Sequence, residues 1–264
     1  MYEVKQAGPK GLGVFATRNI EKGTRIMADE PVFLLAADEP PCDPIEIYDK
    51  FRSVDRATRK QCLQLTCSSD RAKLSKLRKT ALASNTYASK KFSQHRIDEA
   101  VKLAAIFDVN AFEITDKRWS GGKRCAIFLQ ATRFNHSCLP NAGNGWEPNV
   151  GKLSIHAVKE IRAGEEITIS YIDPRQRREV RMQGLWDMYE FECTCVACAI
   201  NLGTVSGRQS VERRLEMEGI CRKLEKARRT HDFALKRANY IPDLQKLIRL
   251  VEEEELVGPW MVDM

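Results

Sequence analysis

Two periods of hydrophobic and polar residues divide this chain into strand-like and helix-like parts. Between residues 150 and 171, apolar residues recur at every second position in two runs separated by the turn Ala163–Glu165. The apolar members are Leu153, Ile155 and Ala157 in the first run, and Ile167, Ile169 and Tyr171 in the second. A period of two predicts half-buried β-strands. Residues 1–37, 110–114 and 125–129 are also predicted to form short strands, with a tight turn at Lys10–Gly13.

A helical pattern interrupts these strands. Asp43 followed by Pro44 is typical of a helix start, with the aspartate as N-cap and proline in the first turn. Ile97, Val101 and Ala104 then recur at helical spacing. We therefore expect a helical insertion over residues 38–106.

The end of the chain returns to the helical period after Cys198. Leu244, Leu247, Ile248 and Val251 share one helix face, and Pro242 lies near the predicted start. Two helices alone bury little apolar surface. The C-terminal part is therefore either the first unit of a longer helical array or a pair that docks on the body of the protein.

Composition and charge narrow the class of protein. The chain has 264 residues, 43% of them hydrophobic and 30% charged, which fits one large domain or a domain with an appendage. The apolar run Pro31–Ala37 is far too short to span a bilayer, and the N-terminus does not resemble a signal peptide. We expect a nuclear or cytoplasmic protein, monomeric and without a membrane segment. The net charge of +7 comes partly from basic clusters at 175–181 and 222–229. These favour solvated helix faces, with nucleic acid as a second interpretation.

The spacing of three cysteines points to a metal. The chain has nine cysteines, and Cys193, Cys195 and Cys198 lie within six residues. Three thiols in one short segment can bind a zinc ion that then needs a fourth ligand. Cys221 could supply it but falls on a predicted helix. The cysteines without close partners, which we expect to be ordinary core or surface thiols, are Cys42, Cys62, Cys67 and Cys125.

Three segments together resemble a known enzyme family. They are Arg133–Asn141, Glu166–Tyr171 and Cys193–Cys198. In this order they resemble the SET-domain protein lysine methyltransferases, and most closely the SMYD-type (SET-and-MYND) branch. The resemblance implies a mostly β fold with α insertions, in which the segment around Asn135 threads beneath a loop as a pseudoknot. The cysteine cluster of a MYND zinc module is missing from the insertion, so that module is not expected.

The resemblance also implies a division of the chain. The predicted parts are the N-terminal SET segment (1–37), the helical insertion (38–106), the C-terminal SET segment (107–181), a cysteine-rich post-SET zinc segment (182–200) and a C-terminal helical region (201–264).

Site residues follow from the resemblance in the same way. It implies contacts to S-adenosylmethionine (SAM) from a set of residues, the fourth zinc ligand, two tyrosines of the lysine channel and a position that limits the number of methyl groups added. The SAM set is Lys10, Gly11, Leu12, Gly13, Asn110, Asn135, His136, Tyr171 and Phe191. The fourth ligand is Cys138, the channel tyrosines are Tyr171 and Tyr189, and the product-limiting position is Ile169. His136 is expected to act through its backbone and packing rather than as a base, and Phe191 could equally be an ordinary core ring.

The predicted function is methyl transfer from SAM to a lysine of a histone or non-histone protein, with one structural zinc. Two alternatives stay open. One is a zinc-containing interaction module with a SET shape and weak activity, and the other is a nucleic-acid-associated regulator that uses the basic helices.

Overall fold

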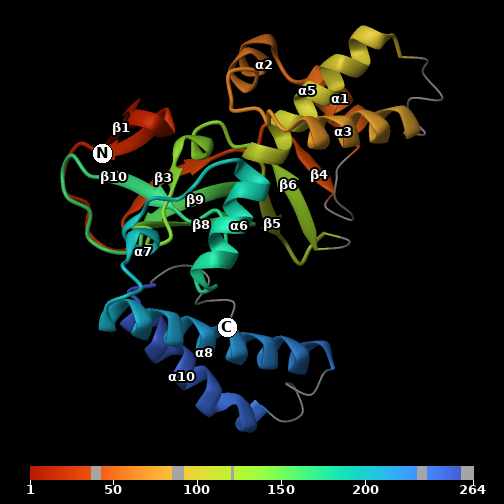
Figure 1. Cartoon of the computed structure of the whole chain (residues 1–264). Helices are drawn as coiled ribbons and strands as arrows, with labels where there is room; N and C mark the ends of the chain where they lie inside the picture. The colour runs from red at the N-terminus through yellow and green to blue at the C-terminus, as the bar shows by residue number, and fades with distance from the viewer. Residues whose placement is uncertain (37–42, 85–91, 120–121, 231–236, 257–264) are drawn as a thin grey trace.

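The computed structural model describes residues 1–36, 43–84, 92–119, 122–230 and 237–256. Three small sheets form the body, a group of helices lies at one end, and a long helical pair lies at the other (Figure 1). The predicted fold class, a β body with α insertions and C-terminal helices, is confirmed.

The first sheet joins distant parts of the chain. Its strands, in spatial order, are β1 (Tyr2–Gln6), β2 (Leu12–Ala16), β10 (Glu166–Ile169) and β7 (Asn135–His136). β10 is antiparallel to β2 and parallel to β7, with Thr168 opposite Asn135 and Ile169 opposite His136. The strand after the predicted glycine turn, the Asn135–His136 strand and the strand that leads to Tyr171 therefore lie in one sheet. The second apolar run ends sooner than predicted, because the strand stops at Ile169 and Tyr171 lies in a bend beyond it.

Two further sheets complete the body. One contains β3 (Arg25–Asp29), β9 (Lys152–Ala157) and β8 (Ala142–Glu147), and the other contains β4 (Leu34–Ala36), β6 (Lys123–Ala126) and β5 (Phe112–Thr115). Short 3-10 turns lie at η1 (Gly8–Lys10) and η2 (Ala131–Arg133). Leu153, Ile155 and Ala157 all point into a core shared with Phe128 and Phe134. Their burial confirms the strand predicted from their alternation.

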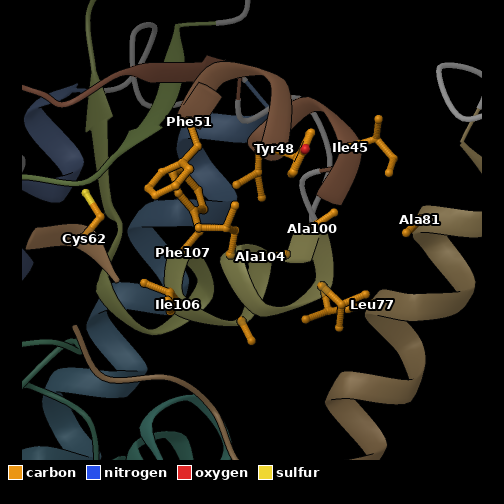
Figure 2. Packing of buried hydrophobic residues seen from close by; sticks show 14 of the residues in the cluster. Ile45, Tyr48, Phe51, Cys62, Leu77, Ala81, Ala100, Ala104, Ile106 and Phe107 are labelled. Atoms are coloured by element: carbon orange, nitrogen blue, oxygen red, sulfur yellow. The ribbon is translucent and has the colours of Figure 1, made fainter. Parts of the chain in front are cut away.

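The helical insertion contains α1 (Pro44–Ser53), α2 (Arg56–Cys62), α3 (Arg71–Ala83) and α5 (Gln94–Asn110). Asp43 caps α1 as predicted, its Oδ1 accepting the backbone N–H of Ile45 at 2.8 Å. Figure 2 shows Phe51 beside Phe107 in the core of this insertion, to which Tyr48 also belongs. α5 runs to Asn110, so the predicted boundary at 106 cuts a helix and the next strand begins only at Phe112.

The remaining helices are α6 (Arg178–Tyr189), α7 (Val196–Ala199), α8 (Val205–Arg229) and α10 (Ile241–Glu253), with the 3-10 turn η3 (Arg237–Tyr240) before α10. α6 spans the predicted boundary at 181. α8 and α10 share a core that includes Leu139 of the body, and Arg177 pairs with Glu218 at 2.8 Å. The C-terminal pair thus docks on the body. Its role as the start of a repeat stays a prediction.

None of the helices in the described residues has both the length and the apolar content needed to cross a bilayer.

Candidate active site and metal centre

Four cysteines from two distant segments meet at one point. The Sγ atoms of Cys138, Cys193, Cys195 and Cys198 all lie within 4.8 Å of one another. Cys138 is 3.5 Å from Cys198 and 4.0 Å from Cys193, sulfur to sulfur. A tetrahedral zinc with Zn–S bonds of about 2.3 Å would separate its sulfurs by about 3.8 Å. The donor set therefore fits zinc. Cys221 lies on α8 and is not part of the group.

The four thiols of this cluster shift one another's pKa values in opposite directions. Hydrogen bonds with the other sulfurs raise the pKa of Cys138 and lower that of Cys195, and a hydrogen bond with Cys138 is the main cause that lowers the pKa of Cys198 to about 6. Cys138 lowers the pKa of Cys193, but hydrogen bonds with Cys195 and Cys198 outweigh it and leave that pKa raised. Zinc ligates thiolates, so its binding would release the protons that the cluster still holds.

Arg181 is a neighbour of the cluster that sequence reasoning missed. It is only 1% exposed, and its Nη2 lies 3.8 Å from the Cys198 Sγ. Its Nη1 donates to the Gln176 carbonyl. A buried guanidinium beside four sulfurs balances the negative charge that thiolates bring. The sequence shows Arg181 only as a member of the basic cluster at 175–181, a pattern that favours solvated helix faces and gives no signal for this role.

The other described cysteines behave as predicted. Cys62 is buried in the insertion core, Cys125 is partly buried and Cys67 is exposed. Burial raises the pKa of Cys62 to about 11, which makes it an unreactive thiol. Cys42 lies outside the described residues.

Three aromatic rings and one imidazole gather beside the cysteines. The ring centroids of Tyr171 and Tyr189 are 4.9 Å apart, and those of His136 and Phe191 are 6.0 Å apart. Tyr171 lies 5.3 Å from His136. We call these four side chains the aromatic cluster. The structure thus brings both predicted channel tyrosines together with two residues predicted to contact the cofactor.

Both tyrosines are held as neutral phenols. The Tyr171 hydroxyl donates to the Phe134 carbonyl at 2.7 Å, and the Tyr189 hydroxyl donates to the Tyr171 carbonyl at 3.3 Å. Burial raises the pKa of each. Neither phenol is suited to act as a base, but each has a fixed oxygen that can orient a reacting group.

The imidazole of His136 links the cysteines to Tyr171. The backbone N–H of Tyr171 donates to Nδ1 at 3.1 Å, so Nδ1 carries no proton. Nε2 therefore bears the hydrogen and lies 3.3 Å from the Cys138 Sγ. Burial lowers the pKa of His136 to about 4, which keeps the ring neutral. This side-chain contact goes beyond the backbone and packing role predicted for His136.

The glycine turn packs tightly against Asn135. A Cβ added to Gly13 would lie 2.8 Å from the Asn135 Nδ2 and 2.9 Å from the Glu166 Oε1. Asn135 donates from Nδ2 to the Leu12 carbonyl at 3.1 Å and to Glu166 Oε1 at 2.8 Å. Lys10 pairs with the other Glu166 oxygen at 2.8 Å. Glu166, to which the sequence assigned no role, therefore joins two predicted cofactor residues, Lys10 and Asn135. Gly11 has φ of 77°, a left-handed value that suits glycine.

Two predicted site residues have other surroundings. Asn110 ends α5, and its Nδ2 donates to the carbonyls of Thr66 and Ile106, both at 2.7 Å. Among the described residues, no hydrogen bond joins it to the rest of the predicted cofactor set. Ile169 is 1% exposed in the main core, which Tyr171 borders. The roles predicted for both stay predictions.

Comparisons with known proteins agree with this geometry. A family model described as "SET domain" matches residues 11–172. The histone-lysine N-methyltransferase set5 of Schizosaccharomyces pombe is 27% identical over 200 residues, covering 76% of this chain and 51% of that protein. The histone-lysine N-methyltransferase SMYD3 of Mus musculus is 32% identical over 136 residues, covering 48% of this chain and 31% of that protein. The N-lysine methyltransferase SMYD2 of Homo sapiens is 38% identical over 101 residues, covering 38% of this chain and 23% of that protein.

The chain belongs to the SET-domain family, and its relatives include SMYD-type proteins. It spans about half the length of the set5 relative.

Proposed function

We propose that this chain is a SAM-dependent protein-lysine N-methyltransferase with one structural zinc. One observation carries the proposal: His136 contacts the Tyr171 backbone through one ring nitrogen and the Cys138 sulfur through the other. The transfer tyrosine, the cofactor motif and the metal cluster thus form one connected unit. Membership of the SET-domain family and relatives named as lysine methyltransferases support the same conclusion.

SAM would be held between the Lys10–Gly13 turn, the Asn135–His136 strand and Phe191. Gly13, which has no Cβ, lets the backbone of the turn lie close to Asn135. The Asn135 amide is in turn held by hydrogen bonds to the Leu12 carbonyl and the Glu166 carboxylate. When bound, SAM supplies a methyl group on a sulfonium. Asn110 would join this set through its side-chain oxygen, since its Nδ2 already bonds to Thr66 and Ile106.

Positioning would supply most of the catalysis. A lysine ammonium with a pKa of about 10.4 must first lose its proton, which a dry channel and a nearby cation both favour. Tyr171 and Tyr189 remain neutral, so they orient the amine rather than deprotonate it. Ile169 offers no hydroxyl to hold a water in the space for further methyl groups, so the enzyme should proceed beyond monomethylation.

Zinc would have a structural role only. Cys138 follows the cofactor strand, and the other three ligands follow α6. The metal would therefore pin residues 182–200, including Tyr189 and Phe191, against the strand that carries His136.

The substrate would be a histone or a non-histone protein, met in the nucleus or the cytoplasm by a monomeric enzyme. Nucleic-acid binding by the basic helices is the weaker alternative. Part of their charge is already used, because Arg222 and Arg229 pair with glutamates one turn earlier.

Titration calorimetry with SAM tests the cofactor half of the proposal. We expect one binding site per chain, strongly weakened by Asn135→Ala and unaffected by Asn149→Ala, an exposed asparagine at a turn. Absence of binding by folded protein would contradict the proposal. Incubation with labelled SAM and whole-cell proteins tests the transfer half. SAM binding without any labelled protein would favour the interaction module instead.

A further inference from the structure

Glu190 stands between two members of the aromatic cluster, Tyr189 and Phe191, without belonging to it. It ends α6 with φ of 60° and ψ of 36°, the left-handed conformation. Among the described non-glycine residues, only Glu190 and Glu255 have positive φ. Helices commonly end this way with glycine, which has no Cβ to crowd the backbone. A glutamate in this conformation therefore needs something to hold it there.

Both carboxylate oxygens of Glu190 receive hydrogen bonds from the helical insertion. Ser68 donates its hydroxyl to Oε1, and Lys73 lies 3.4 Å from the same oxygen. Ser69 donates to Oε2 twice, from its hydroxyl at 2.9 Å and its backbone N–H at 3.1 Å. The hydrogen bond from Ser68 is the main cause that lowers the pKa of Glu190 to about 2. The side chain stays charged and attached at any physiological pH.

The segment that carries the two serines is itself bonded to α5. The serines belong to residues 66–69, which connect α2 to α3 and which we call the clamp loop. Asn110 at the end of α5 donates to the Thr66 carbonyl at 2.7 Å, and Ser68 is buried. α5 and α6 also contact each other directly. A line of contacts therefore runs from α5 through the clamp loop to the side chain of Glu190.

The backbone conformation of Glu190 sets the relative orientation of the Tyr189 and Phe191 rings. The rings of Tyr189 and Phe191 lie 6.4 Å apart at 51°, on either side of the left-handed residue. Relaxation of Glu190 to a right-handed or extended conformation would turn one ring away from Tyr171 and His136. Zinc bound at the four cysteines would fix the chain after Phe191 through Cys193, but none of the four cysteines contacts residue 190.

We propose that Glu190 is a positioning residue, through which the helical insertion holds Tyr189 and Phe191 in the geometry needed for methyl transfer. The inference rests on the proposed function, because these two rings border the sites assigned to the lysine amine and SAM. It gives the helical insertion a role in catalysis. It also gives Asn110 an indirect route to the cofactor site, through the clamp loop.

Two variants break the hydrogen bonds between Glu190 and the clamp loop, one by changing Glu190 and the other by changing the serines. We call them the clamp variants. Glu190→Gln replaces one acceptor oxygen by an NH₂ group, which then faces either the Lys73 ammonium or the Ser69 N–H, according to the orientation of the amide. The double variant Ser68→Ala/Ser69→Ala removes the hydroxyls and leaves residue 190 intact. Glu192→Gln is the matched control, because it removes the same charge from an exposed residue two positions away.

Hydrogen exchange of residues 186–192, zinc content and the methyl-transfer rate are then measured for each protein. The acceptors are purified core histones or, if these are not methylated, whole-cell proteins. Both clamp variants should exchange faster in this segment, keep their zinc, and transfer about tenfold more slowly at saturating SAM. The SAM concentration for half-maximal rate should rise less than about threefold, because Gly13 and Asn135 are untouched. Glu192→Gln should match the wild type.

Unchanged transfer rates in both clamp variants would overturn the proposal, as would a Glu192→Gln variant equally impaired. If the wild type transfers no methyl group to any protein, the proposed function fails on its own. Hydrogen exchange then decides the clamp separately: faster exchange supports it and unchanged exchange overturns it.

Discussion

Replacing Arg181 by methionine should weaken zinc binding without removing any ligand. The guanidinium lies 3.8 Å from the Cys198 Sγ and is almost fully buried. A unit charge pair at this distance gains about 4 kcal/mol at an effective dielectric constant of about 20. The cost of burying the guanidinium, several kcal/mol, offsets much of that gain. Residues that support metal ligands typically change affinity by about 10- to 100-fold, or about 1.4 to 2.8 kcal/mol, and we expect Arg181→Met to fall in this range.

Competition with a chromogenic chelator measures this change directly. Arg181→Lys keeps the charge but loses the planar fork and should lie between Arg181→Met and the wild type. Arg18→Met makes the same substitution at an exposed position and should leave zinc affinity unchanged. If Arg181→Met binds zinc as tightly as the wild type, the charge-balancing role assigned to this arginine is wrong.

Three further predictions test the cofactor turn, the close packing at the start of α8 and the product. Gly13→Ala should lower SAM affinity at least about tenfold in calorimetry, because its Cβ would collide with the Asn135 amide, and an unchanged affinity would contradict the close approach. Gly207→Ala should cost about 1–3 kcal/mol in urea unfolding, because its Cβ would meet the backbone of the preceding turn. Gly219→Ala lies in open space on the same helix and should instead stabilise by about 0.5–1 kcal/mol. Ile169→Tyr should shift the product toward monomethyl-lysine by mass spectrometry while SAM affinity stays nearly constant; a wild type that stops at one methyl would refute this use of Ile169.

Local patterns predicted the elements of this fold well. The period of two found β9, and the Asp43–Pro44 start found α1, because both depend on nearby residues. Boundaries were less accurate where tertiary packing extends a helix. α5 continues to Asn110, where Phe107 packs in the insertion core and the Asn110 side chain bonds to the Thr66 carbonyl, a partner distant in sequence that no local signal marks.

The site residues also fall into those that the sequence predicted and those that it did not. Motif resemblance led to the four cysteines and the aromatic cluster, which the structure brings together. It did not reveal Arg181, Glu166 or the Glu190 clamp. Each acts through a partner distant in sequence, as when Glu190 meets Ser68, and single-chain patterns carry no information on such pairs.

The central claim is that this site transfers a methyl group from SAM to a lysine nitrogen. The most direct measurement is mass spectrometry of proteins incubated with the purified chain and SAM bearing a deuterated methyl group, beside Tyr171→Phe as the paired control. We predict deuterated methyl groups on lysine side-chain nitrogens, at a much lower level with Tyr171→Phe. Label found on no lysine in any protein offered, or equal labelling by the Tyr171→Phe variant, would contradict the claim.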